Sequence, residues 1–531
     1  MIPAFSPARR LLPWFLVALA LSWLAARLQV RALSSPFDYD EVAEAHAVWQ
    51  VGQGMRPYRD FYHDHAPYSW LVWAPVLKAL PEAFESLVLL RLADVALSLL
   101  ALGLLILLVR DLLEGGSAGG EAAPPGGAGP PPPENGGSLA AAAVAVAVMA
   151  THPSSMAVLH QFRGDQLSLV FTLLGLLALG SGGGVPSARR CGAAGLFLMS
   201  GLLITPKLVL LCALTVVLHG ARLRTQGPGL WRPRLAGLLG GAALGFCLWN
   251  AWAFAAGVDP SPFYRLALAY HWANLRESGQ VFGAGRELIE GFGAEPVWLV
   301  ALVAGLAAGA AEIRGRGAAR GATLTALVVF CLVQPLWVKL PWKQYLFSVC
   351  LFWSAPLAVF LQRAVRARRL AGWALLALFA GGFGLQEVLR SRADAGDQSL
   401  AEHLAWGNEV LSRSIPGRTV AVQPPLHPVF RRDATYYFNL AFIPAGRGPG
   451  AALRRPPAGA PRASYEGYME QFEAAPPSIV LASPYFTDKD YMRAALDFVR
   501  VRHPKAYRRE RIAGRTAYVR SRGWDAPSAV P

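Results

Sequence analysis

The most constraining feature of this sequence is a series of long apolar runs that recur from the N-terminus to about residue 390. A helix needs about 20 apolar residues to cross the roughly 30 Å hydrocarbon core of a bilayer. In lipid the backbone must satisfy its own hydrogen bonds, so such runs are predicted to fold as packed helices. Nine runs are clear candidates for membrane spans: 11–30, 86–109, 139–157, 166–181, 235–257, 296–312, 322–338, 344–361 and 371–390.

A tenth apolar region is interrupted at Thr205-Pro206-Lys207 and has arginines on both flanks. If both basic flanks lie on one side of the membrane, the region must enter and leave on that side. We therefore predict two short helices, 192–205 and 206–219, with Lys207 at the tip between them. This brings the expected fold to an α-helical polytopic membrane protein of about eleven transmembrane helices.

The charge of the chain supports the same interpretation. Only 16% of the residues are charged and 54% are apolar, whereas soluble domains carry about 25% charged residues. The net charge of +16 would suit a nucleic-acid-binding protein, but the arginines gather in short clusters between apolar runs, as in loops retained in the cytoplasm. With the N-terminus inside, the clusters fall on the cytoplasmic side at every turn: Arg9-Arg10, Arg110, Arg189-Arg190, Arg222 to Arg234, Arg314 to Arg320 and Arg363 to Arg369. We expect a multi-pass protein of the cell (inner or plasma) membrane, surrounded by membrane lipids and with no nucleic-acid partner.

The remaining segments are assigned by composition. Residues 114–138 are rich in glycine and proline and are predicted to be a flexible cytoplasmic linker. Two outer loops are long, 31–85 and 258–295. The predicted domains are thus a membrane domain, 1–392, and a C-terminal domain, 393–531, which the pass count places outside.

The C-terminal domain has an α/β pattern. Strands are predicted at 418–423 and 478–483, a helix at 488–500 and a hairpin at 507–520. It carries more basic than acidic residues, which does not oppose an outer location, because long domains cross membranes largely regardless of charge. We find no phosphate-binding glycine motif in it.

The first outer loop concentrates acidic residues beside a membrane span. Asp38, Asp40 and Glu41 follow the first predicted helix within about 12 Å of its end, at about 3.3 Å per extended residue. A carboxylate at this boundary between water and headgroups can act as a general base toward a hydroxyl or amine. The alternative is a structural role at a helix start, with Asp40 as the N-cap and Glu41 in the first turn.

Several motifs in this loop and beyond it resemble one family. The loop contains Asp40-Glu41, then Gly54-x-x-Pro57-Tyr58-x-Asp60-Phe61 and His65-Ala66-Pro67-Tyr68. Further along are Arg91, His152-Pro153, Arg163-Gly164-Asp165, Thr205-Pro206-Lys207 and Lys343-Gln344-Tyr345. Together they resemble C-type glycosyltransferases, in particular the protein O-mannosyltransferase, aminoarabinose transferase and rhizobial lipopolysaccharide sugar-transferase group. The similarity covers roughly residues 10–390, and the tail resembles the variable outer domains appended to such enzymes.

This resemblance implies an enzyme of cell-envelope glycan biosynthesis. Such a transferase takes a sugar from a polyprenyl-phosphate donor and passes it to a lipid, glycan or protein acceptor on the outer face, usually with inversion. Asp40 matches the catalytic acidic residue of the family. Glu41 is its motif neighbour, with a structural or acceptor-orienting role, and Asp38 is the second candidate for the base. No cofactor is expected.

The departing lipid phosphate would need positive groups on the outer side. Four side chains qualify by topology: Lys207, Arg163, Arg59 and Lys343. A lysine at a helix break in the membrane favours a cavity or an anion, although snorkelling to the interface would also explain it. Arg59 has the alternative of an ion pair with Asp60 or Asp64.

Other polar residues are candidates for substrate contacts: Asp165, Tyr58, His65 and Tyr345. Asp165 would orient Arg163 or the acceptor, and it could at the same time cap a helix beginning at Gln166. His63 and His65 have a spacing that suits a metal, but zinc prefers three or four protein ligands and only carboxylates lie near. The enzymes that the loop resembles have Lys or His before the proline here, and this resemblance implies contact of His65 with substrate. A divalent metal is left open but not indicated.

Arg91 and Asp94 lie one turn apart in the second predicted span. We expect them to form an intrahelical ion pair with a structural role.

Two other functions fit a polytopic membrane protein. A transporter or lipid flippase would place charged residues near the bilayer midplane and show repeated halves. Here the acidic cluster lies in an outer loop, and only the break at Pro206 fits a transporter. A silent scaffold would leave Asp40 and Lys207 without a shared purpose. The transferase interpretation therefore requires Asp40, Asp165 and Lys207 to converge on one site.

Overall fold

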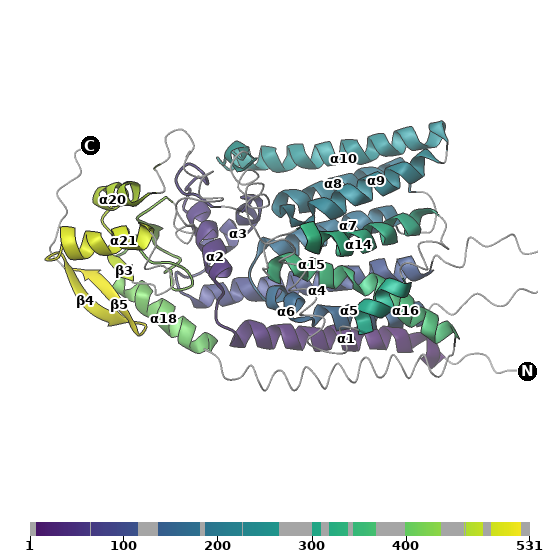
Figure 1. Ribbon diagram of the computed structural model, residues 1–531, viewed down its shortest axis with the longest axis horizontal. Helices are drawn as coiled ribbons and strands as arrows, with labels where there is room; N and C mark the ends of the chain where they lie inside the picture. Colours follow the sequence, from purple (N-terminus) through teal and green to yellow (C-terminus); the bar gives the residue numbers. More distant parts are fainter. Residues whose placement is uncertain are drawn as a thin grey trace, which may run out of the picture.

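The computed structural model describes residues 7–63, 65–114, 136–180, 186–225, 227–264, 300–308, 318–337, 343–367, 399–436, 461, 464–481 and 490–521. The described chain is mostly helical. Figure 1 shows a body of long helices lying side by side, with α2 (Tyr39–Gly52), α3 (Tyr68–Lys78) and the C-terminal helices and strands gathered at one end, on the left of the view. We call this the polar end, and α1 begins at the opposite end of the body.

The helices of the body follow the predicted apolar runs. They are α1 (Pro7–Ser34), α4 (Glu85–Glu114), α5 (Gly136–Ala150), α6 (Pro153–Leu159), α7 (Gly164–Gly180), α8 (Ala188–Ile204), η1 (Pro206–Leu208), α9 (Val209–Arg224), α10 (Pro228–Ala255), α14 (Ala318–Trp337), α15 (Lys343–Phe352) and α16 (Ser354–Ala367). Residues 300–308 are also helical, whereas the predicted span 371–390, most of the linker 114–138 and most of the loop 258–295 lie outside the described residues.

Five helical segments are long and apolar enough to cross a membrane, or six if the bent pair of α5 and α6 forms one span. Two further apolar helices, within α7 and α14, are shorter. The coarse prediction of a helical membrane protein is thus supported. The count of eleven passes and the orientation remain predictions.

The predicted span 139–157 is not one straight helix. The chain bends by 83° between α5 and α6. Pro153 occupies the first turn of α6, where its missing N–H costs nothing, and the backbone N–H of Ser154 donates to His152 Nδ1 (3.2 Å). The bend directs the chain into the segment 160–163, which contributes to the site described below.

The predicted pair of helices around Lys207 is confirmed. α8 ends at Ile204, a single 3-10 turn carries Lys207, and α9 follows. α8 is held close to α10 by glycines: a Cβ on Gly195 would lie 1.9 Å from the carbonyl oxygen of Leu238. Small residues of this kind allow backbones to approach closely in membrane helix packing, and here they fix the helix that leads to Lys207.

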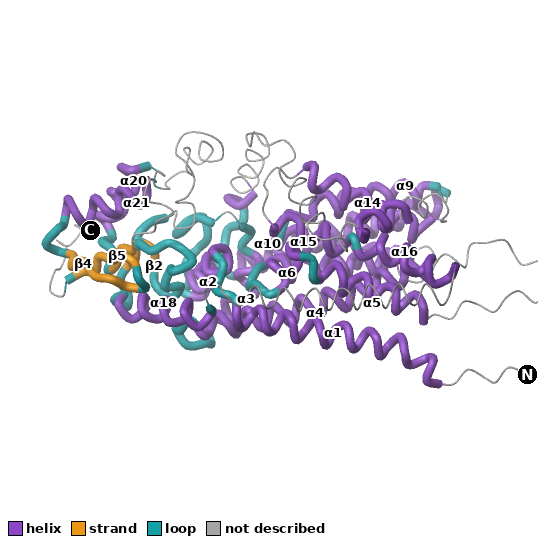
Figure 2. Tube along the Cα trace, turned by 60° about the horizontal axis from the view of Figure 1, so that its bottom comes forward, coloured by secondary structure: helices purple, strands orange, loops and turns teal. Residues whose placement is uncertain are grey.

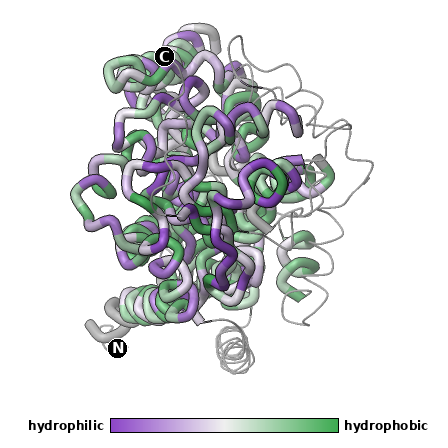
Figure 3. The backbone as a smooth tube through the Cα atoms, turned by 90° about the vertical axis from the view of Figure 1, so that its left-hand side faces the viewer, coloured by the Kyte–Doolittle hydropathy of each residue, from purple (hydrophilic) through white to green (hydrophobic). Residues whose placement is uncertain are grey.

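The polar end contains the remaining elements. They are α2 (Tyr39–Gly52), α3 (Tyr68–Lys78), α18 (Leu400–Arg413), β1 (Thr419–Val420), β2 (Arg432–Asp433), α20 (Tyr465–Ala474), β3 (Ile479–Leu481), α21 (Asp490–Asp497), the π-helical turn η3 (Phe498–Arg502), β4 (Tyr507–Ile512) and β5 (Arg515–Arg520). Figure 2 shows the strands confined to this end. Figure 3 looks onto it and shows hydrophilic stretches interleaved with hydrophobic ones.

The C-terminal elements agree with the sequence pattern. β1 and β3 lie inside the predicted strands, and α21 lies inside the predicted helix. β4 and β5 pair antiparallel across a turn at Ala513-Gly514, whose φ angles of 50° and 69° suit a tight hairpin turn. β5 lies between β3 and β4 in the larger sheet, and β1 pairs parallel with β2. That residues 393–531 form a separate outer domain stays a prediction.

The C-terminal elements contact the start of the chain through buried groups. The backbone N–H of Phe37 donates to His403 Nδ1 (3.2 Å), and His403 Nε2 donates to the carbonyl of Pro425 (2.8 Å). Gly407 leaves room for the ring of Phe84, which lies where a Cβ would clash at 2.5 Å. These contacts bring α18 against the residues that precede α2 and α4.

Candidate active site at the polar end

The N-terminus of α2 is fixed by a capping box. Asp38 Oδ1 accepts from the N–H of Asp40 (3.0 Å), and Glu41 Oε2 accepts from the N–H of Asp38 (2.9 Å). Asp38 is therefore the N-cap, and the alternative that Asp40 caps the helix is wrong. The side chain of Asp40, in the first turn, is left free for other contacts and is 26% exposed.

Glu41 is anchored to α4. Its carboxylate accepts from Arg91 Nε (2.8 Å) and Arg91 Nη2 (2.5 Å), and from the N–H of Phe162 (2.8 Å). Burial would raise the pKa of Glu41, but the Arg91 guanidinium outweighs it and holds the pKa below its ordinary value. Glu41 is fully buried, so its contacts position α2 and do not face a substrate.

The expected pair of Arg91 with Asp94 is wrong. Besides Glu41, Arg91 donates to the carbonyls of Ala32 (2.9 Å), Ser35 (2.8 Å) and Pro36 (3.1 Å), at the end of α1. A buried guanidinium has five N–H donors to satisfy, and one carboxylate a turn away on the same helix cannot reach them all.

Asp94 has a different partner. Its Oδ2 accepts from the backbone N–H of Arg163 (2.6 Å). It thereby fixes the segment that leads into α7, and with it the position from which the Arg163 side chain extends. Nothing in the sequence interpretation gave Asp94 this role.

Arg163 is the centre of the site. Its Nη1 donates to Asp40 Oδ2 (2.7 Å) and its Nε to Asp165 Oδ2 (3.0 Å). Its side chain is only 3% exposed. Among the residues that the structure describes, no group accepts from the buried Nη2. The guanidinium thus bridges two carboxylates, and its Nη2 can still donate a hydrogen bond to a ligand.

Lys207 completes the arrangement. Its Nζ donates to both oxygens of Asp165 at 2.9 Å, and it lies 5.4 Å from the centre of the Tyr345 ring. The side chain of Lys207 is 12% exposed and that of Asp165 is almost fully buried. Asp40, Arg163, Asp165 and Lys207 therefore form one chain of alternating charges, which we call the ion-pair chain.

The ion-pair chain draws on three distant parts of the sequence: α2, the start of α7 and the break between α8 and α9. It brings together the three residues whose convergence the sequence interpretation required. Asp165 lies in the first turn of α7, which begins at Gly164; it orients Arg163, and the alternative of a cap for a helix starting at Gln166 is wrong.

Other predicted contacts lie outside the ion-pair chain. Arg59 is 65% exposed and pairs with Asp60 (2.9 Å), as the structural alternative anticipated. Tyr58 adopts a positive φ of 63°, and its hydroxyl donates to the carbonyl of His65 (2.5 Å), which shapes the loop. The side chain of Lys343 lies outside the described residues.

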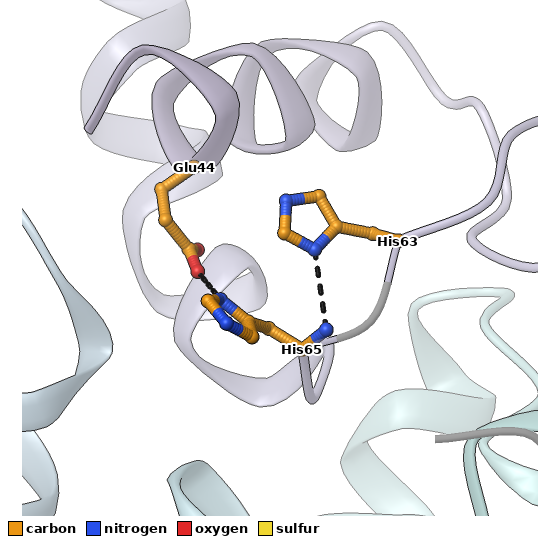
Figure 4. A group of neighbouring side chains, drawn as sticks. All are labelled: Glu44, His63 and His65. Carbon is orange, nitrogen blue, oxygen red and sulfur yellow. Dashed lines mark hydrogen bonds and ion pairs between the residues drawn. The ribbon is translucent and has the colours of Figure 1, made fainter. Parts of the chain in front are cut away.

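A second group of side chains surrounds Glu44, one turn after Asp40 on α2. His65 Nδ1 contacts Glu44 Oε1, and Trp70 Nε1 donates to Glu44 Oε2 (2.5 Å). Figure 4 shows His65 meeting Glu44 while His63 lies beside them. Burial would raise the pKa of Glu44, but His65 lowers it to about 2. Sequence reasoning missed Glu44, although its i,i+4 spacing from Asp40 marks the same helix face.

Asp38 is the one carboxyl beside Asp40 whose pKa approaches neutrality. Partial desolvation and the Asp40 carboxylate raise the pKa of Asp38 to about 6, against the opposing effect of Arg163. Near pH 6 the number of negative charges around Asp40 therefore changes by one.

Neither a known protein family nor a curated protein matches this chain. What can be said of its class is that it is a helical protein with several candidate membrane spans and a buried ion-pair chain at one end. Such a site offers two things: a partly exposed carboxylate that can accept a proton, and buried cations beside it that can stabilise a negative charge.

Proposed function

We propose that this protein is a membrane glycosyltransferase that transfers a sugar from a polyprenyl-phosphate donor to a lipid, glycan or protein acceptor. The observation that carries the proposal is the ion-pair chain, which links the Asp40 carboxylate to Arg163 and, through Asp165, to Lys207. An acid beside buried cations is what displacement of a lipid phosphate by a nucleophile requires. The resemblance of the loop motifs to C-type glycosyltransferases points the same way.

The proposed topology places the polar end outside. Arg91, at the polar end of α4, contacts the last residues of α1, whereas Arg110 lies near the other end of α4. Arg222 and Arg224 end α9, which starts beside Lys207. The distribution of these arginines supports a cytoplasmic N-terminus, about eleven passes and an outer C-terminal domain in the cell membrane.

In the proposed reaction the acceptor hydroxyl or amine attacks the anomeric carbon of the donor sugar. Asp40 takes the proton of the nucleophile as the new bond forms. The bond between the anomeric carbon and the phosphate oxygen breaks, and its electron pair leaves with the polyprenyl phosphate. Arg163 Nη2 and Lys207 Nζ would stabilise that phosphate. A single displacement of this kind inverts the configuration at the anomeric carbon.

The contacts within α2 favour Asp40 over its neighbours as the base. The Asp38 carboxylate is used to cap α2, and Glu41 is buried against Arg91. The side chain of Asp40 is 26% exposed and lies directly against Arg163. The positive charge of Arg163 keeps this carboxylate oriented for an incoming acceptor.

The test is a transfer assay in proteoliposomes with radiolabelled polyprenyl-phosphate mannose, galacturonate and aminoarabinose as donors and envelope lipid extract as acceptor. Asp40→Asn is expected to lower the rate about 10²- to 10⁴-fold, the usual contribution of a general base. Asp490→Asn is the matched control, because Asp490 also lies in the first turn of a helix but pairs with exposed Arg493. Transfer by Asp40→Asn at the wild-type rate would refute the assignment of the base.

A transporter or lipid flippase is the second candidate. The 83° bend between α5 and α6 and the break between α8 and α9 resemble the discontinuous helices of transporters. The same proteoliposomes decide between the two functions. Movement of a labelled lipid-linked sugar across the bilayer without any covalent product would favour the flippase.

A further inference from the structure

Two groups of potential metal ligands lie on either side of α2. One comprises Glu44, His63 and His65, and the other comprises His46, His427 and Asp433. In each group the nearest ligand atoms lie within 4.8 Å of one another. Glu44 and His46 are two positions apart on the helix, so their side chains point to opposite faces. The His46 group has fully buried side chains, and it joins α2 to the C-terminal elements.

The hydrogen bonds of His46 define which of its nitrogens faces the carboxylate of Asp433. Its Nδ1 donates to the carbonyl of Val429 (2.6 Å), which can only accept. The other nitrogen, Nε2, lies 2.6 Å from Asp433 Oδ2. Two lone pairs do not approach so closely unless a proton or a metal ion lies between them.

His427 extends the same arrangement. Its Nε2 lies 2.9 Å from the other oxygen of Asp433, and its ring centre is 4.1 Å from that of His46. Two imidazoles and a carboxylate are a common set for zinc, and a backbone carbonyl on the distal nitrogen of a histidine is the usual outer support of such a ligand.

The Glu44 group is satisfied in another way. The backbone N–H of His65 donates to His63 Nδ1 (3.2 Å), so the lone pair of that nitrogen is already used. Glu44 accepts from Trp70 and contacts His65 through its other oxygen. The hydrogen bonds of this group thus differ from those of the His46 group, and it serves as an internal comparison.

We propose that His46, His427 and Asp433 bind one Zn²⁺ ion, which fastens the segment 427–433 to α2. Ligand atoms around a tetrahedral zinc are about 3.4 Å apart, given bonds of about 2.0 to 2.1 Å. The present separations of 2.6 and 2.9 Å need to widen by less than 1 Å to admit the ion. The proposal does not depend on the transferase function.

The test measures metal content directly. The full chain, purified in detergent with a tag that contains no histidine, is loaded with Zn²⁺, desalted and analysed by mass spectrometry of elements. Wild type is expected to retain about one zinc per chain. Asp433→Asn and His427→Gln are expected to weaken retention more than about tenfold, since even changes to outer-shell groups cost about that much.

Two variants control for other causes of zinc loss. His403→Gln removes a buried histidine that joins the C-terminal elements to Phe37 but belongs to neither group, so it tests whether weaker docking alone releases zinc. His63→Ala alters the other group. Both are expected to keep the ion, and Co²⁺ bound in place of zinc is expected to give the visible absorption of a tetrahedral site in wild type but not in Asp433→Asn.

Three results would overturn the proposal. Wild type that retains no zinc after loading would show that the cation between His46 and Asp433 is a proton. Full retention by folded Asp433→Asn would exclude this carboxylate as a ligand. Loss of zinc in His63→Ala, with retention in His427→Gln, would place the ion in the Glu44 group instead. Each result is read without measuring sugar transfer, so it leaves the proposed function untouched.

Discussion

Replacement of Asp165 by asparagine tests the ion-pair chain at its centre. The carboxylate accepts one hydrogen bond from Arg163 and two from Lys207, at 2.9 to 3.0 Å, and is almost fully buried. Asparagine keeps the shape but removes the charge that compensates both cations. Breaking a buried ion pair on one side costs about 3–5 kcal/mol, because the partner charge is left buried without compensation. We expect Asp165→Asn to lose stability in that range.

A double-mutant cycle separates this effect from a simple loss of packing. Lys207→Met removes the second charge, so Asp165→Asn is expected to cost less in the Lys207→Met background, with a coupling of about 0.5–3 kcal/mol. Equilibrium unfolding in mixed micelles by titration with a denaturing detergent gives the four free energies. The reasoning is refuted if Asp165→Asn has the free energy of unfolding of wild type, or if the effects of the two substitutions on that free energy are additive. In either case Asp165 does not compensate Lys207, and the ion-pair chain does not stabilise the fold.

Two further predictions concern the anchoring and the charges of α2. Arg91→Met leaves Glu41 buried without its cation and is expected to lower the free energy of unfolding by about 3–5 kcal/mol. Arg91→Lys is expected to rescue stability only in part, because one ammonium group cannot hold Glu41 and the three backbone carbonyls that the guanidinium reaches. Unfolding in detergent checks both variants. The pKa of Glu44 in the folded protein is about 2, below the ordinary 4.5. The stability that its carboxylate contributes is therefore present above pH 4.5 and is lost as pH falls toward 2. In Glu44→Gln, stability measured against pH is expected to fall less steeply in acid, and an unchanged profile would contradict the ion pair with His65. The effect of Asp38 on the pH dependence of stability is opposite, because its pKa is raised to about 6. Its contribution to stability therefore falls as pH rises from about 3.8 to 6. Asp38→Asn is expected to remove this trend while asparagine still caps the helix.

The helices could be predicted because their signals are local. Each predicted apolar run is helical over most of its described residues, and the flanking arginines indicated how to interpret the break at Pro206. The bend before Pro153 was not predicted, since proline also occurs inside straight membrane helices, where neighbouring groups satisfy the freed carbonyl. Whether a proline bends a helix depends on what surrounds it, and no single segment of sequence contains that information.

The site could be predicted in part for the same reason. The predicted topology put Asp40 and Lys207 on the same side of the membrane, which allowed them to meet but did not require it. The choice of ion-pair partners did not follow, because Arg91 passes over Asp94 on its own helix and binds Glu41, 50 positions earlier. Spacing shows which side chains can meet, whereas burial decides which of them must, since a buried guanidinium needs an acceptor for each of its N–H groups.

The role of α2 emerges when its contacts are taken together. Within 14 residues it is tied to four parts of the molecule: Glu41 to α4, Asp40 to Arg163, Glu44 to the loop at His65, and His46 to Asp433. His46 lies about 9 Å from Asp40 along the helix axis, at 1.5 Å per residue, near the middle of α2. Through His46 the C-terminal elements contact the same helix that carries Asp40. Since a misplacement of about 1 Å can cost 10²-fold in rate, an attachment at His46 provides a physical reason for an appended C-terminal region to be coupled to the candidate base.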